Sequence, residues 1–335
     1  MRRFLLPRLA LLPVLALGIS MLVFLLVNFI PGDPARIYAG GERATEAQVQ
    51  EVREQYGLDK PLPVQYLTYV SRVARGDFGY SLTYQRSVGE ALRDRFPATI
   101  ELTFAALLVG VPIGLALGIA AATRRNSWVD QIASLVSITG VSIPLFWLGL
   151  MLAWLFSVKL GLLPLSGRLP QFATLEPITG INLIDAPLRG QWTMFGDTLR
   201  HLVLPTLTLA VIPMAIVSRF ARASFIEVLS QDYIRTARAY GIPQRRILRE
   251  HAARNALLPL VTVLGVLVPA LLAGAVLTET VFSWPGVGTL LFEALLHRDY
   301  AVIMSVTLIV GILYVLANLA VDASYAVLDP RTRKS

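Results

Sequence analysis

The chain has 335 residues, of which 55% are hydrophobic and 16% are charged, and its net charge is +8. Charged residues make up about 25% of an average soluble domain, so the composition indicates a membrane protein rather than a soluble enzyme or a soluble nucleic-acid-binding protein. The sequence contains no cysteine, which excludes a disulfide framework, a thiolate metal site, an iron–sulfur cluster and a cysteine nucleophile. We therefore expect an all-α membrane protein.

Six apolar runs are long enough to cross a bilayer, which takes about 20 apolar residues in a helix. The first run is 22 residues long and lacks a small-residue cleavage pattern at its end, so we expect an uncleaved span and not a secretory signal peptide. In chain order, the expected spans are Leu9–Ile30, Ala98–Thr123, Ile132–Val158, Leu202–Phe220, Ala256–Val281 and Val302–Val327.

Two kinds of residue stand out within these spans. Gly110, Gly114 and Gly118 repeat at four-residue spacing, which favours close packing against another helix over a role in substrate contact. Glu101 and Asp322 are the two carboxylates placed inside spans. Intramembrane acids are functional candidates by default, but both lie near the ends of their spans, so a proton relay is not the favoured hypothesis.

Charge asymmetry sets the expected orientation. The chain ends and the loops Thr123–Gln131 and Phe220–Asn255, with Arg219 at the edge of the second loop, together hold sixteen Lys/Arg and five Asp/Glu, whereas the opposite side holds fourteen and fifteen. Cytoplasmic loops carry the excess of Lys and Arg, so both termini are expected in the cytoplasm. The expected organisation is a tail and first span (1–30), an external helical segment (31–97), a five-helix core (98–327) containing a cytoplasmic loop (221–255), and a cytoplasmic tail (328–335).

The external segment is expected to contain two short helices. Thr45 and Gln48 have the spacing of a capping box, and the helix that they start is expected to end at Gly57. A second amphipathic stretch starts at Pro63 and is closed by Gly76. We therefore expect a small helical cap on the outer face.

No catalytic site is expected. The sequence contains neither a GxxxxGK[ST] phosphate loop nor an HExxH motif, the patterns of P-loop ATPases and zinc proteases. The three histidines, His201, His251 and His297, fall at three different membrane edges. We therefore expect no catalytic residue, no metal and no cofactor.

The most distinctive segment is the cytoplasmic loop between the fourth and fifth spans. Its periodicity predicts a helix over Phe225–Tyr240, Gly241 suits the left-handed position after a helix, and Pro243 suits the first position of a second helix. A solvated basic loop is one interpretation. A helix-turn-helix DNA reader is another, but about thirty-five tethered residues leave no room for a supporting third helix. The small residues flanking a glycine corner favour a rigid knob that fits a partner's cleft.

The run Asp232-Tyr233-Ile234-Arg235-Thr236-Ala237-Arg238-Ala239-Tyr240-Gly241 resembles the EAA signature of ABC importer permeases, in its dipeptide/oligopeptide/nickel branch. The signature's Glu-Ala-Ala falls on Arg235-Thr236-Ala237 and its closing Leu-Pro comes late, departures typical of the peptide branch. Further stretches similar to that branch are Pro31–Pro34, Gly57–Pro61, Gly76–Gly79, His251–Pro259 and Glu279–Gly288.

The resemblance implies a type I ABC importer permease fold in a bacterial inner membrane, with six transmembrane helices. It implies a coupling helix that docks on an ATPase, formed by Asp232, Tyr233, Arg235, Thr236, Ala237, Arg238, Ala239, Tyr240 and Gly241. It assigns an outer gate to Glu279, Phe282, Trp284, Pro285 and Gly286, for which a structured loop with an aromatic anchor is the alternative. The implied partners are a homologous second permease, two ABC ATPases and an extracytoplasmic substrate-binding protein.

Peptides are the cargo that the resemblance favours, and nickel chelates or oligosaccharides are the alternatives within the same branch. A secondary transporter working alone is the candidate from a different class, and a membrane enzyme is a third. Neither of these two accounts for the coupling segment, and the spans contain no credible buried ion site.

Overall fold

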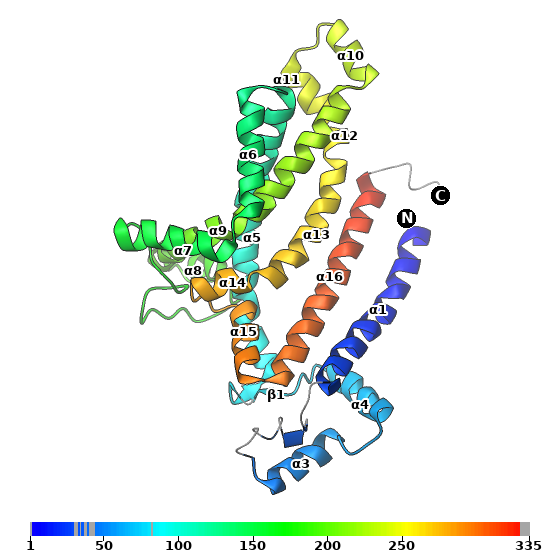
Figure 1. The fold of residues 1–335 in the computed structure, drawn as a ribbon, viewed down its shortest axis with the longest axis vertical. Helices are drawn as coiled ribbons and strands as arrows, with labels where there is room; N and C mark the ends of the chain where they lie inside the picture. Colours follow the sequence, from blue (N-terminus) through cyan, green and yellow to red (C-terminus); the bar gives the residue numbers. More distant parts are fainter. Residues whose placement is uncertain are drawn as a thin grey trace.

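The computed structural model describes residues 2–29, 33, 35–36, 39, 44–81 and 83–328. Within these ranges the chain is almost entirely helical, and its sheet is limited to a hairpin of β1 (Tyr80–Ser81) and β2 (Arg86–Ser87) (Figure 1). The expected all-α fold is confirmed. The Pro31–Pro34 motif (except Asp33), the side chain of Asp322 and the tail after residue 328 lie outside the described residues.

The longest helices, α5 (Val88–Thr123) and α9 (Trp192–Leu229), form the most extensive helix pair. The three glycines of α5 make this contact: a Cβ atom at Gly114 would lie 2.4 Å from the carbonyl oxygen of Met214, and those at Gly110 and Gly118 would be almost as close to α9 backbone. The predicted close packing at these glycines is confirmed, because any larger side chain there would push the helices apart.

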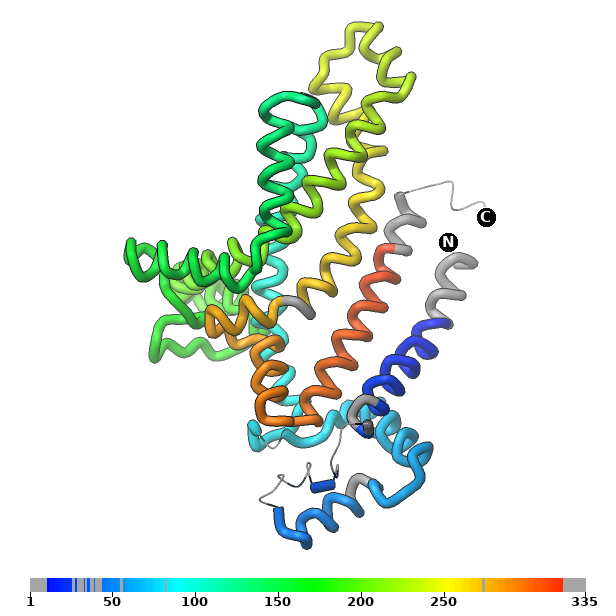
Figure 2. The backbone as a smooth tube through the Cα atoms, in the orientation of Figure 1, coloured from blue at the N-terminus to red at the C-terminus, as the bar shows by residue number. Residues whose placement is uncertain are grey.

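Three helices, α5, α9 and α16 (Tyr300–Leu328), are long and apolar enough to cross a membrane, or five spans if each of two bent pairs counts as one. A sixth span would be α1 (Arg2–Phe29), whose described apolar stretch Leu11–Leu25 is shorter. Helices α1 and α16 run alongside each other (Figures 1 and 2).

The third expected span, Ile132–Val158, is wrong as a single helix. It divides into α6 (Trp128–Ser142) and a second part formed by α7 (Leu145–Leu152) and the π-helix η2 (Ala153–Lys159), and the two parts meet at 103°. Pro144 explains the break, because proline has no N–H to donate and forces the preceding residue out of helical geometry.

The fifth expected span, Ala256–Val281, is also divided. The chain enters it through α11 (Gln244–Arg246), the π-helix η3 (Ile247–Ala252) and α12 (Ala253–Ala256), bends by 55°, and continues as α13 (Leu258–Gly274) and α14 (Val276–Val281). A turn then leads to α15 (Val287–His297).

The two expected helices of the external segment are confirmed as α3 (Glu46–Tyr56) and α4 (Leu62–Ala74). Thr45 and Gln48 form the predicted capping box, and Gly57 ends α3 with a left-handed φ of 63°. The Tyr66 hydroxyl donates a hydrogen bond of 3.0 Å to the Leu17 carbonyl oxygen, which fastens α4 to α1. These helices lie at one end of the molecule, and α10 (Asp232–Ala239) lies at the other (Figure 1).

Candidate functional site

The loop between the fourth and fifth expected spans does not begin with one long helix, so the prediction of a continuous helix over Phe225–Tyr240 is wrong. Helix α9 continues to Leu229, and α10 begins at Asp232, after two intervening residues. Gln231 between them is extended, with φ −71° and ψ 151°. The Ser230 hydroxyl donates to the Glu227 carbonyl oxygen at 2.7 Å, a bond that satisfies an end carbonyl of α9.

The end of α10 has the predicted glycine corner. Gly241 has φ 71°, its N–H donates to the Arg238 carbonyl oxygen at 2.9 Å, and the N–H of Ile242 donates to the Ala237 carbonyl oxygen at 3.2 Å. These two bonds and the left-handed glycine make a Schellman motif, which fixes the exit direction of the chain. Pro243 precedes α11 by one residue instead of opening it.

Only one face of α10 is buried. Ile234 and Ala237 pack into a cluster that includes Phe225 and Ile247, so the small side chain of Ala237 is required for packing within this chain. The other predicted coupling residues are exposed, and Tyr240 is 82% exposed. An amphipathic helix of two turns that presents its polar face outward on a fixed corner has the geometry of a docking element.

The residues predicted to form an outer gate lie together: Glu279 is in α14, and the other four are in the turn that joins α14 to α15. The Glu279 carboxylate is fully buried and accepts hydrogen bonds from the Thr99 hydroxyl at 2.6 Å and from the Thr289 N–H at 3.0 Å. The Trp284 indole N–H donates to the Ala98 carbonyl oxygen at 2.8 Å. The corner is therefore bonded directly to α5.

The packing of this corner is dense. Phe282 and Trp284 are both at most 1% exposed. A Cβ atom at Gly286 would lie 2.2 Å from the nearer Glu279 carboxylate oxygen, so glycine is required there. Of the five predicted gate residues, Pro285 is the one that is partly exposed and the other four are buried.

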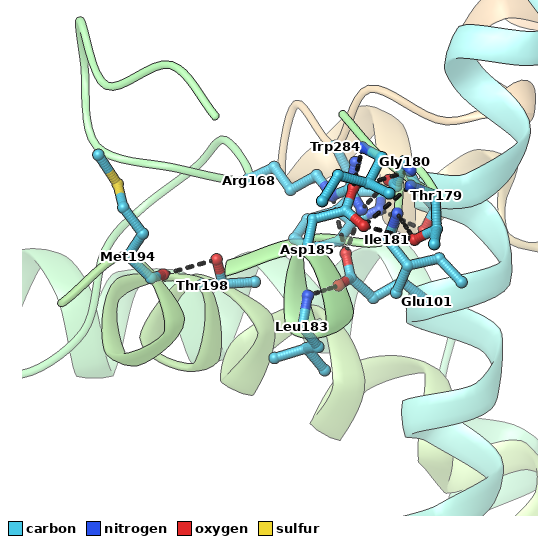
Figure 3. Close-up of polar contacts among 12 residues, drawn as sticks. Glu101, Arg168, Thr179, Gly180, Ile181, Leu183, Asp185, Met194, Thr198 and Trp284 are labelled. Carbon is cyan, nitrogen blue, oxygen red and sulfur yellow. Dashed lines mark hydrogen bonds and ion pairs between the residues drawn. The ribbon is translucent and has the colours of Figure 1, made fainter. Parts of the chain in front are cut away.

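Sequence reasoning missed the ion pair between Glu101 and Arg168 beside this corner (Figure 3). Arg168 donates from Nε to the Glu101 carboxylate at 2.7 Å and from its terminal nitrogen to the Gly180 carbonyl oxygen at 2.8 Å. Its guanidinium carbon lies 5.8 Å from the centroid of the Trp284 ring. The sequence did contain a hint of this ion pair, because Glu101 is a carboxylate inside the second expected span. An acid at such a position needs a partner.

Asp185 in the short helix α8 (Asn182–Leu188) holds the loop that contains Gly180. Its carboxylate accepts hydrogen bonds from the Thr179 hydroxyl at 2.6 Å and from the N–H groups of Thr179, Ile178 and Gly180 (Figure 3). Burial alone would raise the pKa of Asp185, but these bonds outweigh it and hold the pKa below its ordinary value. The loop is thus fixed against α5 and Trp284 without regular secondary structure.

Helices that are long and apolar enough to cross a membrane define the class as a membrane protein. The chain belongs to the family described as binding-protein-dependent transport system inner membrane component, whose model matches residues 114–334, and the model of its N-terminal part matches residues 1–103. It is therefore a permease subunit of an ABC importer and not an enzyme, and separate subunits hydrolyse ATP.

The similar curated proteins match over nearly their whole length. The di/tripeptide transport system permease protein DppB of Pseudomonas aeruginosa is 45% identical and the dipeptide transport system permease protein DppB of Escherichia coli is 44% identical, each over 99% of both chains. The probable D,D-dipeptide transport system permease protein DdpB of Escherichia coli is 47% identical over 94% of this chain and 92% of its own. A solved chain of the inward-facing MetNI methionine ABC transporter aligns with a TM-score of 0.49 and 18% identity, over 72% of this chain and 94% of that chain.

Proposed function

We propose that this chain forms half of the membrane pathway of a di- or oligopeptide importer, with a homologous second permease, two ABC ATPases and an extracytoplasmic binding protein as partners. The observation that carries the proposal is the exposed face of α10, which is held on a fixed glycine corner at one end of the molecule. The names of near-full-length relatives support a dipeptide or tripeptide cargo. Nickel chelates and oligosaccharides are the alternative cargoes, and binding measurements on the cognate binding protein distinguish them.

In this proposal, α10 and both termini lie in the cytoplasm, because the basic residues concentrate on that side. Residues 31–97 then form the external segment and residues 98–327 the permease core. The exposed residues of α10 dock in a groove of an ATPase subunit, where Arg235 and Arg238 pair with acidic groups. Because Ile234 and Ala237 anchor α10 in the cluster with Phe225, a displacement of α10 is passed to α9 and η3.

The α14–α15 corner serves as the outer gate in the same proposal. Its hydrogen bonds to Thr99 and Ala98 connect the corner to α5. A tilt of α5 against α9 would therefore carry the corner with it, because buried and fully hydrogen-bonded groups move as a unit. The gate and the coupling helix would then respond to the same helix motion.

The test is a substitution at the glycine corner. Gly241→Asp is expected to leave insertion and assembly intact, because a Cβ atom at Gly241 meets no other atom within 4 Å, and to uncouple ATP hydrolysis from peptide uptake. Gly161→Asp is the matched control, since Gly161 also has positive φ and open surroundings but lies in another loop. Reconstituted importer is assayed for binding-protein-stimulated ATPase activity and peptide uptake. Coupled uptake in Gly241→Asp, or the same defect in Gly161→Asp, would refute the docking role.

A further inference from the structure

A groove between α5, α6 and α9 has a charged group that the transport mechanism above does not use. Its volume is about 260 Å³, and it is lined by Ala121 of α5, by Ser134, Ser137 and Ile138 of α6, and by Arg219 and Arg222 of α9, among others. The two arginines lie three residues apart on α9, so they share a helix face.

The two arginines differ in their pairing. Arg222 makes a two-pronged ion pair with Asp130, with distances of 2.6 and 2.8 Å, and the Asp130 carboxylate also accepts the N–H of Asn126 at 3.0 Å. Arg219 is exposed, and no carboxylate in the described part of the chain pairs with it. The Asp130 and Arg222 charges cancel, so the groove keeps one net positive charge at Arg219.

The depth of the groove matches a lipid headgroup region. Trp128, the first residue of α6, is 70% exposed, and exposed tryptophans gather at membrane–water interfaces. Ser134 lies six residues further along, about 9 Å at 1.5 Å per residue. An arginine one or two turns below the interface reaches the headgroups with its long side chain.

The surface that continues from the groove is apolar. Leu135 and Ile138 on the outer side of α6 are each 63% exposed, and Ile132 is 51% exposed. A water-filled substrate path would place polar groups on such a wall, whereas hydrocarbon chains suit branched aliphatic side chains. The groove therefore combines a single positive charge with an adjoining apolar strip.

We propose that this groove binds the phosphate headgroup of an anionic phospholipid, with Arg219 as the charged donor and an acyl chain along Leu135 and Ile138. Basic pockets between transmembrane helices at the cytoplasmic side bind lipid headgroups in this way. The proposal uses the cytoplasmic orientation of the loops but not the coupling role of α10, so either can fail without the other.

The experiment measures lipid retention by the assembled importer with native mass spectrometry, during titration with phosphatidylglycerol or with phosphatidylcholine of the same acyl chains. Phosphatidylglycerol is expected to be retained preferentially, and Arg219→Gln is expected to weaken its retention about tenfold, the effect of losing one charge-assisted hydrogen bond. Arg219→Lys should restore most of the retention. Arg125→Gln is the control, because Arg125 is an exposed arginine in the adjoining loop outside the groove.

Equal weakening by Arg219→Gln and Arg125→Gln would overturn the proposal, because it would indicate general attraction to basic loops. Equal retention of the two lipids would also overturn it, as would displacement of phosphatidylglycerol by millimolar inorganic phosphate, which would identify a site for a free anion. A groove covered by the second permease would leave retention unchanged in every variant, and that result overturns it as well.

Discussion

The first of two corners to compare lies between α14 and α15, and the second is formed by α10 and Gly241. Both change the direction of the chain within a few residues, but the first buries its polar groups and the second exposes them. Around Glu279 the carboxylate and the aromatic rings face inward, and their polar atoms are bonded to α5. In α10 the apolar residues Ile234 and Ala237 face inward and the polar face is exposed. The first corner is complete within this chain, whereas the second presents a surface that a partner can complete. Substitutions should therefore change stability at the first corner and coupling at the second.

The largest effect is expected from breaking the ion pair beside the α14–α15 corner. The side chains of Glu101 and Arg168 are 1% and 12% exposed, and removal of one partner of a buried pair costs about 3–5 kcal/mol. Arg168→Gln should therefore lower the thermal stability and the yield of the importer. The double variant Glu101→Gln/Arg168→Gln should be less damaging than the sum of the single variants. Additive losses would mean that the pair contributes no coupling energy.

The next largest effect is expected from Gly288→Ala. A Cβ atom at Gly288 would lie 2.6 Å from the Cα of Val276 and 2.8 Å from a Glu279 carboxylate oxygen, and overpacking of this kind costs about 1–3 kcal/mol. The loss of stability is measured by thermal unfolding of the purified importer. Gly196→Ala is the control, because a Cβ atom there meets no atom within 4 Å. If both variants unfold at the same temperature, the corner is not as tightly packed as described.

The smallest effect on stability is expected from Tyr240→Ala, at the residue that directly follows α10. The side chain is 82% exposed, and surface substitutions usually change stability by less than about 0.5 kcal/mol. Binding-protein-stimulated ATPase activity should nevertheless fall in this variant, because docking surfaces lose affinity when an aromatic anchor is removed. A normal ATPase response in a stable Tyr240→Ala importer would leave the exposed face of α10 without a coupling role.

Features set by neighbouring residues were predictable from the sequence. The capping box at Thr45 and the left-handed Gly57 and Gly241 follow from backbone sterics that act within a few residues. The class of protein also followed, because apolar runs and a signature segment are visible without a fold.

Features that depend on distant parts of the chain were not predictable in the same way. A proline can kink a span sharply or bend it only slightly. The size of the bend at Pro144 depends on which neighbouring helices form hydrogen bonds with the backbone groups that the proline leaves unpaired. The partner of Glu101 lies 67 residues away, in a loop without periodicity. The burial of Ala237 depends on η3, which packs against α10. Each of these is a tertiary contact.

The most direct test of the coupling role is disulfide cross-linking from α10 to the ATPase subunit. The chain contains no cysteine, so Tyr240→Cys places a single thiol of this chain on the exposed face, and Ala237→Cys places one on the buried face as a control. Tyr240→Cys is expected to cross-link to a cysteine in the ATPase groove, with a yield that changes when ATP binds, and Ala237→Cys is not. The absence of any cross-link from Tyr240→Cys to an ATPase cysteine series in an active importer would contradict the assignment of α10 as the docking element.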